Sequence, residues 1–269
     1  MGKLATRSHL DFVTPGLTIY SNTMLDPDAT PRDPRPLLRG VGGLALLGTA
    51  LTIGQHLASL VPATPEAWAW GAAHLAGGLA ALALGHRVLT RAYPLVDLAA
   101  QGATNPAAAL QLTAHRLAAA AIAGACWGGI DGPSLLVSAV FTVLAWVSVA
   151  LICAGHRAVT RYADHEEVAN GNVAAALASA GLHLAVALVV MRALQGPFLG
   201  WAPSLAAYGL ALAWVLILWP LRQIVVARLL LRGTPRDMDL AVAGRQDVWI
   251  GAVEALAYVV TALTVSSAW

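Results

Sequence analysis

The sequence predicts an all-α integral membrane protein with seven transmembrane helices and parallel internal repeats of about 70 residues. Three observations support this fold class. Apolar stretches of about 20 residues recur along the chain, arginine gathers in alternate connections, and one polar motif returns at a regular spacing. The chain is 58% hydrophobic and 11% charged, whereas about a quarter of the residues in soluble domains are charged. Because hydrocarbon cannot solvate unpaired backbone groups, each apolar stretch should cross as a helix.

The apolar stretches define the transmembrane spans in chain order. The expected helices cover residues 38–61, 68–89, 106–125, 133–155, 173–191, 204–226 and 248–269. At a rise of about 1.5 Å per residue, each is long enough to cross about 30 Å of hydrocarbon. Pro220 falls inside the sixth helix and should kink it or end it early.

Residues 1–36 should form a flexible cytoplasmic segment, followed by a single transmembrane helical domain over residues 37–269. The stretch 21–36 is rich in proline and aspartate, a composition typical of extended or disordered chain. The segment also lacks the apolar core and small-residue cleavage site of a signal peptide. The first apolar helix is therefore expected to act as an uncleaved anchor.

The basic residues predict the orientation in a bacterial inner (plasma) membrane. Arginines precede the first helix, end the second, follow the fourth and surround the connection from the sixth to the seventh. The alternate connections, at 62–67, 126–132 and 194–203, carry neither lysine nor arginine. The positive-inside rule then places the N-terminus in the cytoplasm and the C-terminus in the periplasm or outside. Five tryptophans fall near the predicted outer boundary, as an aromatic belt would: Trp68, Trp70, Trp127, Trp201 and Trp269.

An internal repeat is the strongest pattern beyond hydropathy. Residues 85–110 read GHRVLTRAYPLVDLAAQGATNPAAAL, residues 155–177 read GHRAVTRYADHEEVANGNVAAAL, and a weaker copy lies at 227–252. The repeat elements lie near 85–125, 155–194 and 227–269. Each unit contains two helices, so successive units share one orientation and the repeats are parallel, unlike those of inverted-repeat transporters.

The starts of the repeat helices, GNVAAALASAG at 171–181 and TNPAAALQL at 104–112, resemble the inner-membrane family called domain of unknown function 350, the YjfL-like proteins. The resemblance covers most of residues 38–269, and the chain looks like an extended form of the family. The resemblance is specific at the second copy of the repeat, moderate at the first and weak at the third, where Asp247 replaces asparagine. The resemblance implies an inner-membrane bundle, with no catalytic residues to carry over.

Asn105, Asn172 and Asp247 occupy the same position of the repeat, where a loop becomes a helix. Asparagine and aspartate are favoured N-caps, because their side-chain oxygens accept hydrogen bonds from free N–H groups. We therefore expect helix caps at these positions. An alternative is that three helix N-termini surround a vestibule for an anion or a lipid phosphate.

A polar stripe follows from the caps, because positions seven and eleven residues later return to nearly the same helix face. These positions hold Ser179 and His183, Glu254 and Tyr258, and Leu112 and Arg116 with His115 beside it. Ionisable groups are costly in lipid, so they should face the bundle interior. We predict an ion pair or water-bridged contact between Arg116 and Glu254, with His183 nearby. The stripe is either a buried polar knot that holds helix register or a proton or ion path.

Several other histidine and acidic residues are of the types that bind metal ions or haem. His56 and His74 lie at similar depth on adjacent antiparallel helices. They are weak candidates for a haem or a metal ion, and the alternative is two separate residues that pack among helices or reach to the interface. His86 and His156 suit cytoplasmic helix ends. The acidic run of Asp164, Glu166 and Glu167 with His165 should form a solvated loop or interfacial turn, since it lacks a recognised ligand spacing.

The net charge and the absent motifs limit the possible functions. A net charge of +2 without a basic stripe argues against a nucleic-acid partner. No phosphate-binding loop, HExxH, CxxC or GxSxG motif occurs, so no catalytic residue or cofactor is predicted, and an enzyme is the less favoured class. Membrane lipids are the expected partners, no soluble partner can be named, and small-residue helix faces allow a homo-oligomer. The leading hypothesis is a structural or interaction component of the envelope. The alternatives are a channel or proton/ion-coupled transporter, and a haem- or metal-binding redox protein.

Overall fold

A computed structural model describes residues 35–267 except 61–63, 94–97 and 161. Every regular element in this part of the chain is helical. The predicted flexible segment 1–36 lies almost entirely outside the described residues, and its last two positions already belong to the first helix. The fold below concerns the compact unit Asp33–Trp269.

Seven long helices occupy the ranges that hydropathy predicts. They are α1 (Arg35–Leu60), α2 (Pro65–Ala92), α4 (Pro106–Cys126), α5 (Gly132–Val159), α7 (Val173–Leu194), α8 (Trp201–Val225) and α10 (Val248–Ser267). The largest boundary difference is four residues, at the end of α5, because this helix continues past the apolar run into its basic last turn. Pro220 lies inside α8 without ending it early, since the helix continues to Val225.

Short helical segments fill the connections at one end of the bundle. They are α3 (Leu98–Gln101), α6 (Asp164–Ala169) and α9 (Pro235–Asp239), with π-helical turns η1 (Val226–Leu230) and η2 (Leu240–Gly244). Most of the described arginines lie at this end, which we call the arginine-bearing end. The described polar connections at this end thus contain short helical segments.

Five of the long helices, α1, α2, α5, α7 and α10, contain stretches long and apolar enough to cross a membrane. In α8 only Trp201–Leu216 qualifies as a shorter apolar stretch. The central helix α4 carries Gln111, His115 and Arg116, which lower its mean hydropathy. These side chains are tolerated because α4 packs against α1, α2, α5 and α7 and is largely covered by protein.

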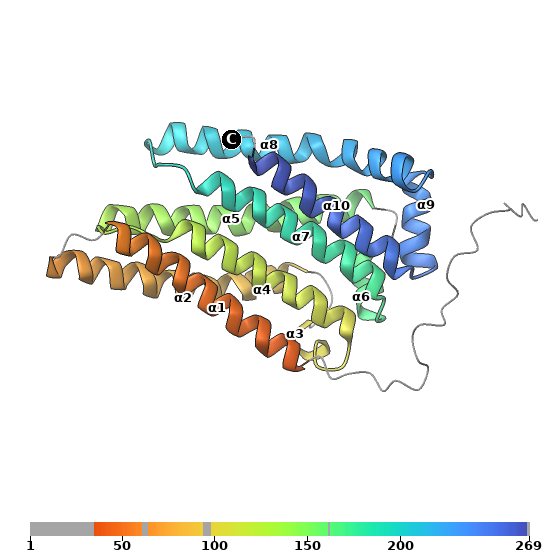
Figure 1. Ribbon diagram of the computed structural model, residues 1–269, viewed down its shortest axis with the longest axis horizontal. Coiled ribbons are helices and arrows are strands. Elements are labelled where there is room, and N and C mark those ends of the chain that lie inside the picture. Colours follow the sequence, from red (N-terminus) through yellow and green to blue (C-terminus); the bar gives the residue numbers. More distant parts are fainter. Residues whose placement is uncertain (1–34, 61–63, 94–97, 161, 268–269) are drawn as a thin grey trace, which may run out of the picture. The chain divides into compact units, whose positions relative to one another are not determined.

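The long helices form two layers, with α1, α4, α7 and α10 side by side in one and α2, α5 and α8 in the other (Figure 1). Two glycines bring the backbones of α7 and α10 close together. A Cβ atom added to Gly181 would lie 2.4 Å from Cα of Ala255, and one added to Gly251 would lie 2.4 Å from the carbonyl oxygen of Ala174. Small residues therefore let these two backbones touch.

Candidate functional site

The centre of the first layer holds three buried polar side chains, Gln111 and His115 on α4 and His183 on α7. Gln111 and His115 are fully buried and His183 is 4% exposed. The two imidazole rings lie 4.7 Å apart between centroids. The terminal amide of Gln111 lies 3.0 Å from Nε2 of His115 and 3.1 Å from Nδ1 of His183. Gln111 therefore bridges two histidines that lie on neighbouring helices.

The hydrogen-bonding capacity of these groups determines how the bridge is made. Nδ1 of His183 lies 2.8 Å from the carbonyl oxygen of Ser179, which can only accept, so this nitrogen carries a proton. It cannot at the same time accept from an amide N–H. The nitrogen and oxygen of a glutamine amide exchange places by a flip. With its oxygen between the two rings, Gln111 accepts from Nε2 of His115, and the single N–H at Nδ1 of His183 is shared between this oxygen and the carbonyl oxygen of Ser179.

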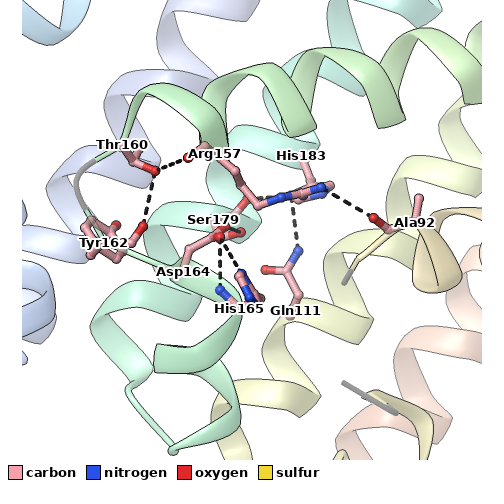
Figure 2. Close-up of polar contacts among 9 residues, drawn as sticks. All are labelled: Ala92, Gln111, Arg157, Thr160, Tyr162, Asp164, His165, Ser179 and His183. Carbon is pink, nitrogen blue, oxygen red and sulfur yellow. Dashed lines mark hydrogen bonds and ion pairs between the residues drawn. The ribbon is translucent and has the colours of Figure 1, made fainter. Parts of the chain in front are cut away.

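A second group of polar side chains adjoins His183 towards the arginine-bearing end (Figure 2). Ser179 donates from Oγ to Oδ2 of Asp164, at 3.1 Å, and the backbone N–H of His165 donates to Oδ1. Asp164 is only 6% exposed. Burial raises the pKa of Asp164, while nearby Arg157 and the Ser179 hydroxyl act in the opposite direction.

Arg157 connects this group to α2. Its guanidinium lies over the ring of Tyr93, 5.4 Å from the centroid, and donates to the carbonyl oxygen of Ala92 at 3.4 Å. The Tyr93 ring in turn lies 5.7 Å from that of His115 and 6.0 Å from that of His183. The polar centre is thus enclosed by an aromatic ring and by the end of α2.

A third polar group links α10 to α5. The hydroxyl of Tyr258 donates to Oε1 of Glu254 at 3.0 Å, and Nε2 of His156 lies 2.8 Å from the same hydroxyl. Between this group and Asp164 lies a cavity of about 10 Å³, lined by Ser179 among others. That volume corresponds to about one water molecule at most. The two groups are therefore neighbours separated by very little space.

Arg116 occupies a different environment. It lies half-buried on α4 beside α1, where a Cβ atom added to Gly42 would be 3.3 Å from Nη1 of Arg116. Glu254 is on α10, and α7 lies between α4 and α10 in the layer (Figure 1). The contact expected between Arg116 and Glu254 stays a prediction.

The repeated asparagines cap their helices and also bind the next short segment. Oδ1 of Asn105 accepts from the N–H groups of Ala107 and Ala108, and its Nδ2 donates to the carbonyl oxygen of Val168, 2.8 Å away at the end of α6. Oδ1 of Asn172 accepts from the N–H of Ala175.

The donor side of Asn172 repeats this arrangement one step along the layer. Its Nδ2 donates to the carbonyl oxygen of Val242 in η2 at 3.0 Å and to Oε2 of Glu167 at 2.8 Å. Asp247 caps α10 through the N–H groups of Trp249 and Ile250. A carboxylate has no N–H to donate, so Asp247 is a cap alone.

An apolar band separates the polar centre from the opposite end of the bundle. It is formed by fully or nearly fully buried side chains of α4 and α7: Ala118, Ala119, Ile122, Ala123, Val186, Val189 and Val190. The band occupies the two helical turns that follow His115 and His183 along their helices. Along α4 and α7, the polar centre is thus bordered by this apolar band on one side and by the polar groups of the arginine-bearing end on the other.

His74 and His56 lie beyond this band. His74 is fully buried, and its Nε2 lies 3.1 Å from Oγ of Ser134 and 3.4 Å from the carbonyl oxygen of Asp131. His56 is exposed and lies against Gly128. Within the described ranges, no three histidine, cysteine, aspartate or glutamate side chains gather as a metal site would require. The two histidines thus differ in burial and in partners.

Sequence reasoning missed Gln111 in the polar centre and Tyr93 beside it, and it misjudged Asp164 in the adjoining group. Gln111 lies four residues before His115, a same-face spacing that could have identified it. Tyr93 had no sequence signal. Asp164 was expected in a solvated loop or interfacial turn, but it is buried as the first residue of α6 because that short helix folds back against α4 and α7. Of its neighbours in the acidic run, Glu166 is exposed and Glu167 is bound by Asn172.

A comparison with known protein families matches residues 130–269 to the Domain of Unknown Function (DUF350) family. The match spans the second and third copies of the repeated motif and reaches from the start of α5 to α10. Comparisons with curated proteins and with solved structures found no match. The relevant likeness is therefore to a family whose activity is not established.

Proposed function

The chain belongs to the Domain of Unknown Function (DUF350) family, and from this membership and the packing described above we propose that it is a structural or interaction component of the bacterial envelope. In this proposal it is a multi-pass protein of the inner membrane, held in one arrangement by buried polar contacts. Its expected partners are membrane lipids and, through small-residue faces, further copies of the chain.

The finer topology belongs to the same proposal. Seven spans would follow if α4 and α8 cross together with the five strongly apolar helices. Parallel repeats of about 70 residues are supported by the matching hydrogen bonds of Asn105 and Asn172 to the next short segment. The arginines at one end support a cytoplasmic N-terminus and an extracytoplasmic C-terminus.

The structural role is supported by an interruption in the row of buried polar side chains. Gln111 stands between His115 and His183, and an amide, unlike an imidazole or a carboxyl, does not readily pass on a proton. Beyond the two histidines, the buried side chains that α4 and α7 contribute to the apolar band around Ile122 and Val186 are alanine, isoleucine and valine. These features suit a polar knot that holds helix register.

A second candidate, a proton- or ion-coupled transporter, is favoured by one observation. Asp164, Glu254 and His156 are ionisable, and they lie on two sides of the same small cavity. Ionisable groups inside a membrane bundle often mark proton or ion paths. For this role a second conformation would have to open the apolar band.

Proton flux and stability measured on the same variant separate the two roles. We expect Glu254→Gln to lower the resistance of the purified protein to thermal unfolding, since Tyr258 then faces a neutral amide in place of a carboxylate. Proteoliposomes containing the wild type or the variant should acidify at the rate of empty liposomes. Glu66→Gln on the exposed first turn of α2 is the matched control. A proton flux in the wild type that Glu254→Gln abolishes would establish the transporter instead.

A further inference from the structure

A cavity of about 600 Å³ lies at the end of the bundle opposite the arginine-bearing end. It is bounded by α1, the end of α4, the start of α5 and the connection from α7 to α8. A smaller cavity of about 120 Å³ adjoins it and shares six of its lining residues, Phe198 and Cys126 among them. The volume falls in the range of about 300–1,000 Å³ found for small-molecule sites.

The lining has two chemical parts. Gln55, Ser138 and Gln195 offer amide and hydroxyl groups that can donate and accept hydrogen bonds. The second part is aromatic and aliphatic and leads into the smaller cavity: Trp127, Val137, Phe141, Leu194 and Phe198. A molecule that fills both parts would have a hydrogen-bonding head and an apolar body.

Charge narrows the class of ligand further. None of the residues that line the two cavities is aspartate, glutamate, lysine or arginine, and the exposed imidazole of His56 is the lining group that can carry a positive charge. Nearby Asp131 is exposed, and its carboxylate accepts from the N–H of Ser134. A charged head would lose its hydration here without gaining a carboxylate, lysine or arginine partner, which is costly. An uncharged head bearing carbonyl or hydroxyl groups would incur no such cost.

The depth of the cavity fits a ligand that arrives from the membrane. Ser138 lies six residues into α5 and Thr52 eight residues before the end of α1, or about 9 and 12 Å from those helix ends at 1.5 Å per residue. This is the level at which headgroups give way to hydrocarbon. We infer that this cavity binds an uncharged amphiphile, with its carbonyl- or hydroxyl-bearing head at Gln55, Ser138 and Gln195 and its apolar body along Phe198. This role goes beyond the structural one and does not depend on it.

Cys126 provides a reporter inside the cavity. The chain has two cysteines, and Cys153 is buried elsewhere in α5. In a Cys153→Ala protein, Cys126 is therefore the single thiol, and its labelling by a small methanethiosulfonate reagent can be followed by mass spectrometry. We expect 1,2-dioctanoylglycerol or a short-chain benzoquinone to protect it. At about ten times its Kd, a probe should slow labelling by about tenfold by mass action. The more protective probe identifies the source of the head group, a glyceride or a quinone.

Two variants test the position of the ligand. Ser138→Phe fills the cavity and Gln55→Leu removes a head-group partner with little change of volume, so both should abolish protection. Val147 is 47% exposed on the same helix, so Val147→Phe is the matched control and should leave protection unchanged. Dioctanoyl phosphatidate, with the same chains and a charged head, should not protect. Equal protection by phosphatidate, protection that survives Gln55→Leu in a folded protein, or no protection by either neutral probe would each overturn the assignment.

Discussion

Nδ2 of Asn172 donates a hydrogen bond to the carbonyl oxygen of Val242, 3.0 Å away and seventy positions further along the chain. The same side chain caps α7 through its oxygen. Asn105 makes the corresponding pair of contacts one step earlier in the layer, to α4 and to Val168. One amide thus ends a helix and holds the short segment that precedes the next helix. Both of its functional groups are used, which explains why asparagine, and not merely any capping residue, occupies these positions.

Replacing the amide of Asn172 by a carboxylate should therefore be destabilising. Asn172→Asp keeps the cap acceptor but loses both donors, and it places a second carboxylate against Glu167. Because the site is fully buried, we expect a loss of about 2–4 kcal/mol in the free energy of unfolding. The matched control is Asp247→Asn, which should change it by less than about 0.5 kcal/mol, since only the cap acceptor is used there. Unfolding by SDS in mixed micelles measures both, and equal losses would contradict this account of the amide.

The close contact of α7 and α10 predicts that one methyl group at Gly181 is not tolerated. A Cβ atom there would lie 2.4 Å from Cα of Ala255, so the two backbones must separate. We expect Gly181→Ala to cost about 1–3 kcal/mol, as overpacking does in other cores. Gly48→Ala on α1 is the control, because nothing lies within 4 Å of its added Cβ. This control should be neutral or stabilise the helix by up to about 1 kcal/mol. Scanning fluorimetry of the two variants in detergent would show the difference, and matching melting temperatures would refute it.

Asp164 should make stability depend on pH with a defined sign. Burial raises its pKa, so the folded protein holds this proton more tightly than the unfolded chain does. Its contribution to stability is fully present below the unfolded pKa of about 3.9 and is lost as pH rises through the raised folded pKa. Relative to the wild type, Asp164→Asn should therefore gain stability between acidic and neutral pH.

Asp237 is a control for this measurement, because its pKa is shifted in the opposite direction. It is fully exposed, and hydrogen bonds from Thr234 lower the pKa of its carboxyl. Its contribution is present above the unfolded pKa and is lost as pH falls through the lowered folded pKa. Thermal unfolding of the wild type, Asp164→Asn and Asp237→Asn across pH 3 to 8, in steps of about one unit, would resolve the two signs. A pH profile of Asp164→Asn parallel to that of the wild type would show that the buried carboxyl does not titrate on unfolding.

The polar knot predicts non-additive effects at Gln111 and His115. Gln111→Leu removes the acceptor for Nε2 of a fully buried His115 and should cost about 1–3 kcal/mol. The double variant Gln111→Leu with His115→Leu removes both partners, so its loss should be smaller than the sum of the two single losses. Chemical unfolding of the four proteins completes the cycle. Strict additivity would mean that the two side chains do not act as a pair.

Interactions between residues that are close in the sequence explain which features of this protein could be predicted from the sequence alone. Apolar runs and flanking arginines determined the seven long helices to within four residues, because helix formation in an apolar setting depends on composition within one segment. Capping also depends on neighbours in the chain, so Asn105, Asn172 and Asp247 could be identified as helix starts.

Contacts between distant segments were decided only by the tertiary structure. The second use of the Asn172 amide, the burial of Asp164 and the glutamine bridge between His115 and His183 all depend on which helices become neighbours. Helix periodicity specifies which side chains share a face, but it does not specify what lies opposite that face. That choice depends on close packing between backbones, as at Gly181 and Ala255, where the absence of a side chain on α7 determines how near α10 can approach.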